Sequence, residues 1–285
     1  MKHIIRKHLN EVYQTKQLFE GFDDQDNPDL KYYAFDWDDN ILEMPTKIIV
    51  LDEDGKEVGM STEDFAEYRT MIGVEEFDYK GHKIIGFSET PFKNFRVEGD
   101  KQFVVDSMLA KPGPSWNDFV ECINGGSIFA IITARGHTPT VLRESIYNFI
   151  QTNHMGINKE VLVYNLKKYR DLVGEKIKDD NKLINDYLDL CKYYPVSFGT
   201  NAEANPEEAK KEALKEFIAY VKEMSSNLGK KAFLKNDISN NFIPSIGFSD
   251  DDVRNIEKIK DFLEKEYEDN PVRTYLTSKG EKKEV

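Results

Sequence analysis

Short apolar runs alternate along the chain with segments whose apolar residues recur at helical spacing. The runs are continuous and end at polar residues, which is typical of strands buried on both faces of a parallel sheet. Strands are predicted at residues 31–35, 127–133, 193–198 and 241–249. Helices are predicted at residues 114–123, 138–150, 205–224 and 250–267. Strands that alternate with helices predict an α/β fold, a Rossmann-like parallel sheet covered by helices.

The segment between the first two of these strands has a different pattern. Two short strands flank Asp54-Gly55, a strong signal for a tight hairpin. Ser61 and Asp64 then form a capping box ahead of a helix. The chain therefore divides into parts of different pattern: an N-terminal helix and linker at 1–30, a core at 31–42 and 115–270 with a helical insertion at 157–190, an inserted α+β unit at 43–114, and a flexible polar tail at 271–285.

Length and composition fit a globular protein with one large core, or with a core and an accessory unit. The chain has 285 residues, of which 39% are hydrophobic and 32% are charged. No apolar run is long enough to cross a bilayer, and the N-terminus lacks the apolar stretch of a secretory signal, so we expect no membrane partner. Cys122 and Cys191 are too few for a disulfide framework or a zinc site, which favours a cytoplasmic location.

The charge is strongly acidic, with a formal net value of −13. Most nucleic-acid-binding proteins carry a basic surface, and the overall balance here does not provide one. Only residues 1–8 are locally basic. They fit either a short amphipathic helix packed on the protein or a docking arm for an acidic partner, and the sequence leaves both readings open.

Acidic and hydroxyl side chains lie where the predicted strands end. Asp36 and Asp38 follow the first strand, Thr133 ends the second, and an acidic triplet begins at Asp250. Each alone has a simple structural explanation, such as a solvated loop, a turn or a helix N-cap. Together they lie at the carboxyl edge of one parallel sheet, where the ligands of such sheets bind.

Two acidic clusters at neighbouring strand ends repel each other unless a cation lies between them. Magnesium suits such a position, because it prefers oxygen ligands and is usually held by few carboxylates together with water and phosphate. A lysine of the helix at 205–224 would add positive charge. Lys210 shares a helical face with Leu214 and Phe217, so we predict that it is buried. Lys211 is predicted to face solvent.

The order of these motifs resembles that of the haloacid dehalogenase superfamily. That family carries DxD after its first strand, Ser or Thr after its second, then a lysine, then an acidic pair. Here the motifs read "FDWDDNIL", "IFAIITARG", "EEAKKEAL" and "GFSDDDVRNI". The resemblance covers residues 31–42 and 115–268, while 43–114 lies where the superfamily carries a cap. Asp39 and Asn40 replace the commoner Gly-Thr, which leaves the reacting groups intact and the fit of the substrate open.

The resemblance implies a magnesium-dependent phosphatase. Asp36 would attack phosphorus and form an aspartyl-phosphate. Asp38 would protonate the leaving oxygen and then activate water, and this second acid favours phosphate transfer over dehalogenation. Magnesium would be held by Asp36, the backbone carbonyl of Asp38, and Asp251.

The remaining roles follow from the same resemblance. Thr133 and Lys210 would hold phosphate oxygens. The spacing of the acidic motif pairs Asp251 with Asn255 and leaves Asp250 as the neighbouring acid, paired with the lysine. Asp252 is predicted at the helix N-cap.

Other classes of protein carry similar signals. A response-regulator receiver also has acids, threonine and lysine at strand ends, but its acidic pair comes first and its chain is much shorter. A DxD glycosyltransferase would need a nucleotide-sugar domain, which the pattern does not indicate. A polynucleotide end phosphatase and a non-catalytic protein of this fold, for example one of phage origin, stay open. We expect a small phosphorylated metabolite, such as a sugar phosphate or nucleoside monophosphate, because a lid would enclose it and the acidic charge disfavours polyanions. The oligomeric state is not predicted.

Overall fold

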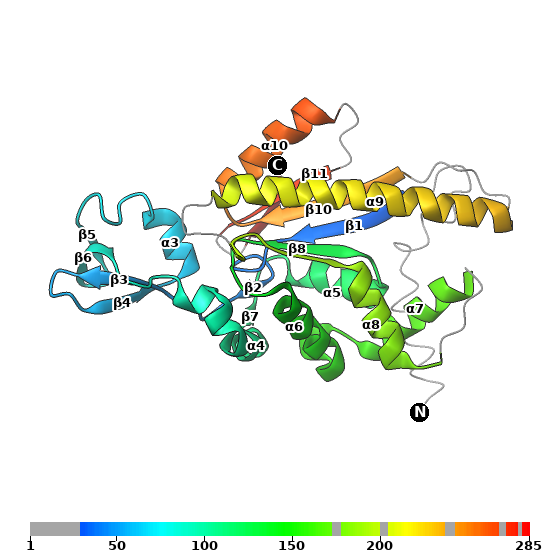
Figure 1. Ribbon diagram of the computed structural model, residues 1–285, viewed down its shortest axis with the longest axis horizontal. Helices are drawn as coiled ribbons and strands as arrows, with labels where there is room; N and C mark the ends of the chain where they lie inside the picture. Colours follow the sequence, from blue (N-terminus) through cyan, green and yellow to red (C-terminus); the bar gives the residue numbers. More distant parts are fainter. Residues whose placement is uncertain (1–28, 173–177, 200–204, 237–242, 268–271, 279–280) are drawn as a thin grey trace.

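A six-stranded sheet forms the centre of the molecule (Figure 1). The computed structural model describes residues 29–172, 178–199, 205–236, 243–267, 272–278 and 281–285. The strand order is β12-β11-β10-β1-β8-β9, and every pairing is parallel except that of β11 with β12. The strands are β1 (Asp29–Phe35), β8 (Phe129–Thr133), β9 (Lys192–Pro195), β10 (Ile243–Asp250), β11 (Val272–Ser278) and β12 (Glu281–Glu284). This is the mixed α/β sheet that the alternating pattern predicts.

Helices cover both faces of the sheet (Figure 1). One face packs against α9 (Pro206–Asn236) and α10 (Val253–Glu266). The helices on the other face are α5 (Trp116–Gly125), α6 (Pro139–Thr152), α7 (Lys159–Leu172) and α8 (Asp180–Leu190), with the short η3 (His154–Gly156) after α6. Within the described residues, every helix is too short or too polar to span a bilayer.

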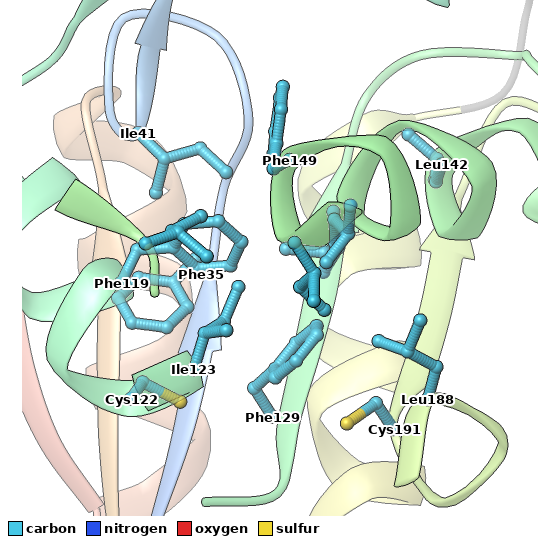
Figure 2. Packing of buried hydrophobic residues seen from close by; sticks show 14 of the residues in the cluster. Phe35, Ile41, Phe119, Cys122, Ile123, Phe129, Leu142, Phe149, Leu188 and Cys191 are labelled. Atoms are coloured by element: carbon cyan, nitrogen blue, oxygen red, sulfur yellow. The ribbon is translucent and has the colours of Figure 1, made fainter. Parts of the chain in front are cut away.

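The continuous apolar runs of the strands reflect burial on both faces. Along β1, Tyr32 and Ala34 belong to the cluster under α9 and α10, whereas Phe35 belongs to the opposite cluster. Figure 2 shows part of this second cluster, in which the ring of Phe35 meets that of Phe119 of α5 at a centroid distance of 5.5 Å. Burying such side chains removes apolar surface from water, which is the main favourable term in folding.

Capping residues set the helix ends that the sequence predicts. The Thr138 side chain accepts a hydrogen bond from the N–H of Val141, with Pro139 at the first position of α6. Gly126 ends α5 in the left-handed conformation with φ 73°. Asp252 caps α10 by accepting from the N–H of Arg254. The predicted N-cap at Asp252 is confirmed.

Residues 43–114, called the insertion below, form a smaller α+β unit at one end of the sheet (Figure 1). The chain enters and leaves it through β2 (Leu42–Glu43) and β7 (Lys111–Pro112), which pair with each other. Its antiparallel sheet has the order β4-β3-β6-β5 and a small apolar core of its own. Its elements are β3 (Ile48–Asp52), β4 (Glu57–Met60), α3 (Thr62–Tyr68), β5 (Phe77–Tyr79), β6 (His82–Phe87), η1 (Lys93–Phe95), η2 (Val97–Gly99) and α4 (Asp100–Leu109). The hairpin at Asp54-Gly55 and the cap at Ser61 are confirmed.

Two predicted boundaries need correction. The tail at 271–285 is not loose, because residues 272–278 form β11 beside β10 and residues 281–284 form β12. The buried residues of β11 include Val272, Thr274 and Thr277. Their spacing is irregular and their neighbours are polar, so this segment of the sequence resembles a loop. The first strand begins at Asp29 rather than at residue 31. The predicted N-terminal helix lies outside the described residues.

The strand order has a direct consequence for where a ligand can bind. Along the chain the parallel strands are β1, β8, β9, β10 and β11, and the sheet places them in the order 3-2-1-4-5. The order reverses between β1 and β10. In sheets of this kind the crevice beyond the carboxyl ends of the strands at that reversal is the usual ligand site.

Candidate active site

Three neighbouring strands end at the same edge of the sheet. Phe35, the last residue of β1, lies opposite Ser249 of β10, and β8 pairs along the other side of β1. Asp36 after β1, Asp250 at the end of β10 and Thr133 at the end of β8 therefore emerge side by side. The N–H of Asp36 donates to the carbonyl of Ser249 at 3.0 Å, which fixes the chain as it leaves the strand.

A cluster of three carboxylates lies at this edge. Asp36, Asp250 and Asp251 each place an oxygen within 4.8 Å of the others. Asp36 and Asp250 are buried, and Asp251 is half-buried. The carboxylate of Asp38 is not part of this cluster. The ligand role predicted for the backbone carbonyl of Asp38 stays a prediction.

The carboxylate of Asp250 accepts hydrogen bonds from three neighbouring residues. It accepts hydrogen bonds from Lys210 at 2.7 Å, from the side-chain amide of Asn255 at 2.8 Å and from the N–H of Asp252 at 3.0 Å. Asp36 differs, because its Oδ1 is buried and has no hydrogen-bond partner among the described residues. Asp36 and Asp251 are thus the members of the cluster with oxygens left for a ligand.

Lys210 is the cation inside this cluster. Its Nζ lies 2.7 Å from Asp250 and 3.2 Å from Asp36, and the side chain is 2% exposed. Burial alone would lower the pKa of Lys210, but Asp250, Asp36 and Asp251 outweigh it and the pKa is raised, so the amine stays charged. Lys211 instead pairs with Glu208 and Glu212 at the surface of α9. The helical register therefore separates the two lysines as predicted.

One lysine does not balance three carboxylates in a buried place. Burial raises the pKa of Asp36 to about 7, with Lys210 opposing the shift and Asp250 and Asp38 adding to it. Burial, reinforced by Asp250 and Asp36, also raises the pKa of Asp251 well above its usual range. The cluster favours an added positive charge, and a hard divalent cation with oxygen ligands would meet that demand.

Asp38 forms a fork-shaped ion pair with Arg135. The Nε of Arg135 donates to Oδ2 at 2.7 Å and its Nη2 donates to Oδ1 at 2.6 Å, while the Arg135 side chain is 1% exposed. Arg135 is a site residue that the sequence patterns did not predict. One feature of the sequence could have indicated it. Arg135 is a cationic residue two positions after Thr133, at the edge of the sheet where the acidic residues lie.

Arg135 is positioned by residues of both the core and the insertion. Its Nη2 donates to Thr46 at 3.1 Å, its guanidinium lies 4.5 Å from the centre of the Phe95 ring, and its Nη1 lies 3.1 Å from Nε2 of His137. Because arginine only donates, Nε2 of His137 accepts, and Nδ1 donates to Asp100 at 2.9 Å. A buried chain of contacts thus runs from Asp100 through His137 and Arg135 to Asp38.

Asn40 and Asp39 lie in the loop that follows β1 and have different local environments. Asn40 donates from its side-chain amide to the carbonyl of Ser249 at 2.5 Å and contacts its hydroxyl at 3.0 Å, which ties the loop after β1 to the end of β10. Asp39 adopts the left-handed conformation with φ 52°. Burial raises the pKa of Asp39 to about 6, with Asp38 adding to the shift and the Thr62 hydroxyl opposing it.

A cavity of about 280 Å³ lies between this edge of the sheet and the insertion. Its core side is lined by the charged and polar residues described above: Asp36, Asp38, Thr133, Arg135, Lys210, Asp251, Asp252 and Asn255. Its insertion side is lined by Ile48, Thr62, Phe65, Ala66, Arg69, Phe92, Phe95 and Arg96. All the predicted site residues except Asp250, which lies beneath the floor paired with Lys210, border this cavity.

Two arginines of the insertion join it to the core at the rim of the cavity. Arg69, which follows α3, contacts Glu207 of α9 at 2.5 Å and lies 3.9 Å from Asp252. Arg96 donates to the carbonyl of Ser197 at 2.6 Å. A small molecule in the cavity would therefore be enclosed by both parts of the chain.

Comparison with known proteins gives no further guidance, since no protein-family model, curated protein or solved structure significantly matches this chain.

Proposed function

We propose that this protein is a magnesium-dependent phosphatase of the haloacid dehalogenase type, with the insertion acting as its cap. The observation that carries the proposal is the convergence of Asp36, Lys210 and Asp251 in the lining of one cavity at the reversal of the strand order. A buried carboxylate with a free oxygen, a fixed cation and a second acid are the groups that phosphoryl transfer needs.

The residues present fit a magnesium ion. Asp36 offers an oxygen without a hydrogen-bond partner among the described residues, and Asp251 adds a second carboxylate to the cluster. With the backbone carbonyl of Asp38, the donor set would consist of hard oxygen ligands. The ion would supply charge neutralisation of the phosphoryl group when bound. Lys210 and Thr133 would hold the phosphoryl oxygens from the side of the core.

The first step is a displacement at phosphorus. A carboxylate oxygen of Asp36 attacks and the bond between phosphorus and the ester oxygen breaks. Asp38, which first takes up a proton from water when its pairing with Arg135 is released, gives that proton to the departing ester oxygen, so that an alcohol leaves. Water then attacks the aspartyl-phosphate, Asp38 takes the proton of that water, and phosphate leaves with the Asp36 carboxylate restored.

The ion pair with Arg135 constrains how Asp38 can act. Arg135 occupies both carboxylate oxygens in the absence of substrate. A phosphoryl dianion that enters the cavity competes for the same guanidinium, because arginine binds phosphate and carboxylate with the same fork of donors. Release of one Asp38 oxygen by this exchange would free it for the proton transfers.

Replacement of Asp36 tests the proposal. With magnesium and a generic aryl phosphate we expect the wild type to turn over, EDTA to stop it, and Asp36→Asn to lower kcat by at least about 10³-fold, as the loss of a nucleophile does elsewhere. Asp38→Asn should slow esters of poor leaving groups more than nitrophenyl phosphate, which needs little protonation. Turnover that survives EDTA or Asp36→Asn would refute the proposal.

A further inference from the structure

The cap side of the cavity differs in chemistry from the core side. Three of its residues are polar: Thr62 and two arginines, and both arginines are already engaged with the core. Arg69 pairs with Glu207, and Arg96 donates to the carbonyl of Ser197. The hydroxyl of Thr62 lies near Asp39 but has no hydrogen-bond partner among the described residues.

The remaining cap residues of the lining are apolar. Phe95 lies over the guanidinium of Arg135, which leaves Ile48, Phe65, Ala66 and Phe92 to face a bound molecule. We call these four residues the apolar wall. The rings of Phe65 and Phe92 lie edge to face, with centroids 5.5 Å apart and an interplanar angle of 76°. Two rings fixed at this angle present both a face and an edge to a third ring, which are the geometries that aromatic groups prefer.

This wall discriminates between classes of phosphomonoester. The hydroxyls of a sugar phosphate would lie against it without hydrogen-bond partners, and a buried polar group without a partner is unfavourable. A flat aromatic ring would bury apolar area and contact Phe65 and Phe92. The cavity of about 280 Å³ is at the small end of the range of ligand sites, roughly 300–1,000 Å³. It therefore suits a single phosphoryl group attached to a compact leaving group.

We infer that the site takes phosphomonoesters whose leaving alcohol carries a flat aromatic ring, with Phe65 and Phe92 as the residues that select it. The inference rests on the proposed function and narrows its substrate class. A simple arylmethyl ester and a nucleoside monophosphate share the required ring, and the experiment separates them.

Matched pairs of esters isolate the ring from the reactivity of the leaving group. Benzyl phosphate is compared with cyclohexylmethyl phosphate, since both release a primary alcohol and differ in the ring. Nucleoside 5′-monophosphates are compared with ribose 5-phosphate, which lacks the base. We expect kcat/KM to be about three- to tenfold higher for the aromatic member of at least one pair, in line with the contribution of aromatic pairing beyond buried area. The pair that shows the effect identifies the ring.

Variants of the wall assign the effect to residues. Phe65→Leu and Phe92→Leu keep an apolar side chain and remove the ring, so they should abolish the preference in kcat/KM for the aromatic member of the pair. Phe87→Leu is the control, because Phe87 packs against Phe65 with ring centroids 6.2 Å apart and does not line the cavity. It should keep the preference.

The outcomes separate this inference from the proposed function. Turnover of methyl phosphate with no preference in either pair, or a preference that survives both Leu variants, overturns the inference and leaves the phosphatase proposal standing. If no ester is turned over, the phosphatase proposal fails. In that case calorimetric titration compares the affinities for benzylphosphonate and cyclohexylmethylphosphonate. Tighter binding of benzylphosphonate supports the inference, and equal affinities overturn it.

Discussion

Two adjacent lysines of α9 lie in opposite environments, and the difference can be measured. Lys210→Ala would leave Asp36 and Asp250 buried without their cation. Removal of one partner of a buried ion pair usually costs about 3–5 kcal/mol, so we expect a loss of that order in the free energy of unfolding, measured by urea denaturation. Lys211→Ala, the matched control, should change stability little because its partners lie at the surface. Equal losses in the two variants would contradict the assigned register.

His137 makes stability depend on pH in a predictable direction. Burial and the nearby Arg135 lower its pKa, and the hydrogen bond with Asp100 and the charge of Asp38 oppose this. The folded protein thus binds this proton less readily than the unfolded chain, whose histidine has a pKa of about 6.5. The resulting contribution to stability is present above pH 6.5 and is lost as the pH falls below it.

The variant His137→Gln tests this dependence. Glutamine can accept from Arg135 and donate to Asp100 but cannot take up a proton. Between pH 7.5 and pH 5 the free energy of unfolding should therefore fall less in the variant than in the wild type. Equal falls would show that His137 does not titrate in this range.

Among the single residues of the site, the sequence predicts those that have a periodic or local signal. Lys210 follows from helical spacing, and Asp36 follows from its place directly after a buried strand. The pairing of Asp38 with Arg135 joins residues 97 positions apart and depends on how far each side chain reaches across the cavity. The chain of contacts through His137 to Asp100 depends in addition on where α4 docks. No pattern along the chain carries that information.

The attachment of the insertion to the core can be tested at one glycine. An added Cβ at Gly136 would lie 2.8 Å from the side chain of Arg96 and 2.9 Å from the carbonyl oxygen of Ser197, the two groups that hydrogen-bond each other. Gly136→Ala should therefore displace Arg96 and lower the free energy of unfolding by about 1–3 kcal/mol, the usual result of overpacking.

Hydrogen exchange would locate the effect. The amides of η1 and η2 should exchange faster in Gly136→Ala, while those of β1 and β8 stay protected. Gly86→Ala is the control, because a Cβ at that position of β6 meets no atom within 4 Å. Unchanged exchange in η1 and η2 would mean that Arg96 does not hold the insertion.

Among the elements, the sequence identifies those with strong periodicity and fails for the last two strands. Hairpin, capping and helix signals are local, and each predicts an element that the structure contains. β11 cannot be recognised from its own sequence, because two of its buried residues, Thr274 and Thr277, are polar. It is recognised as a strand only by its pairing with β10. Its place beside β10 is a property of the sheet.

For the whole molecule, the fold explains why so much negative charge lies in one place. The parallel order brings the ends of β1 and β10 together at the reversal of the sheet, and each carries acidic residues. The chain as a whole has a net charge of −13, so the surroundings add to the repulsion within the cluster. The protein thus keeps an electrostatically unfavourable site that a cation would relieve, a common feature of functional sites.

The last prediction follows from that repulsion. Without divalent cations, Asp36→Asn should raise the thermal midpoint, because it removes one of three converging carboxylates and leaves Lys210 paired with Asp250. Magnesium in hundredfold excess over its Kd stabilises a protein by about 2.7 kcal/mol, which for a chain of this size corresponds to a rise of roughly 5–10 °C. We expect this rise in the wild type and its loss in Asp36→Asn and Asp251→Asn. Sodium chloride at equal ionic strength controls for screening, and Asp186→Asn on α8 controls for the loss of any acid. If Asp36→Asn and Asp251→Asn keep the full rise, magnesium does not bind at this cluster, and the strand ends must be balanced by another cation.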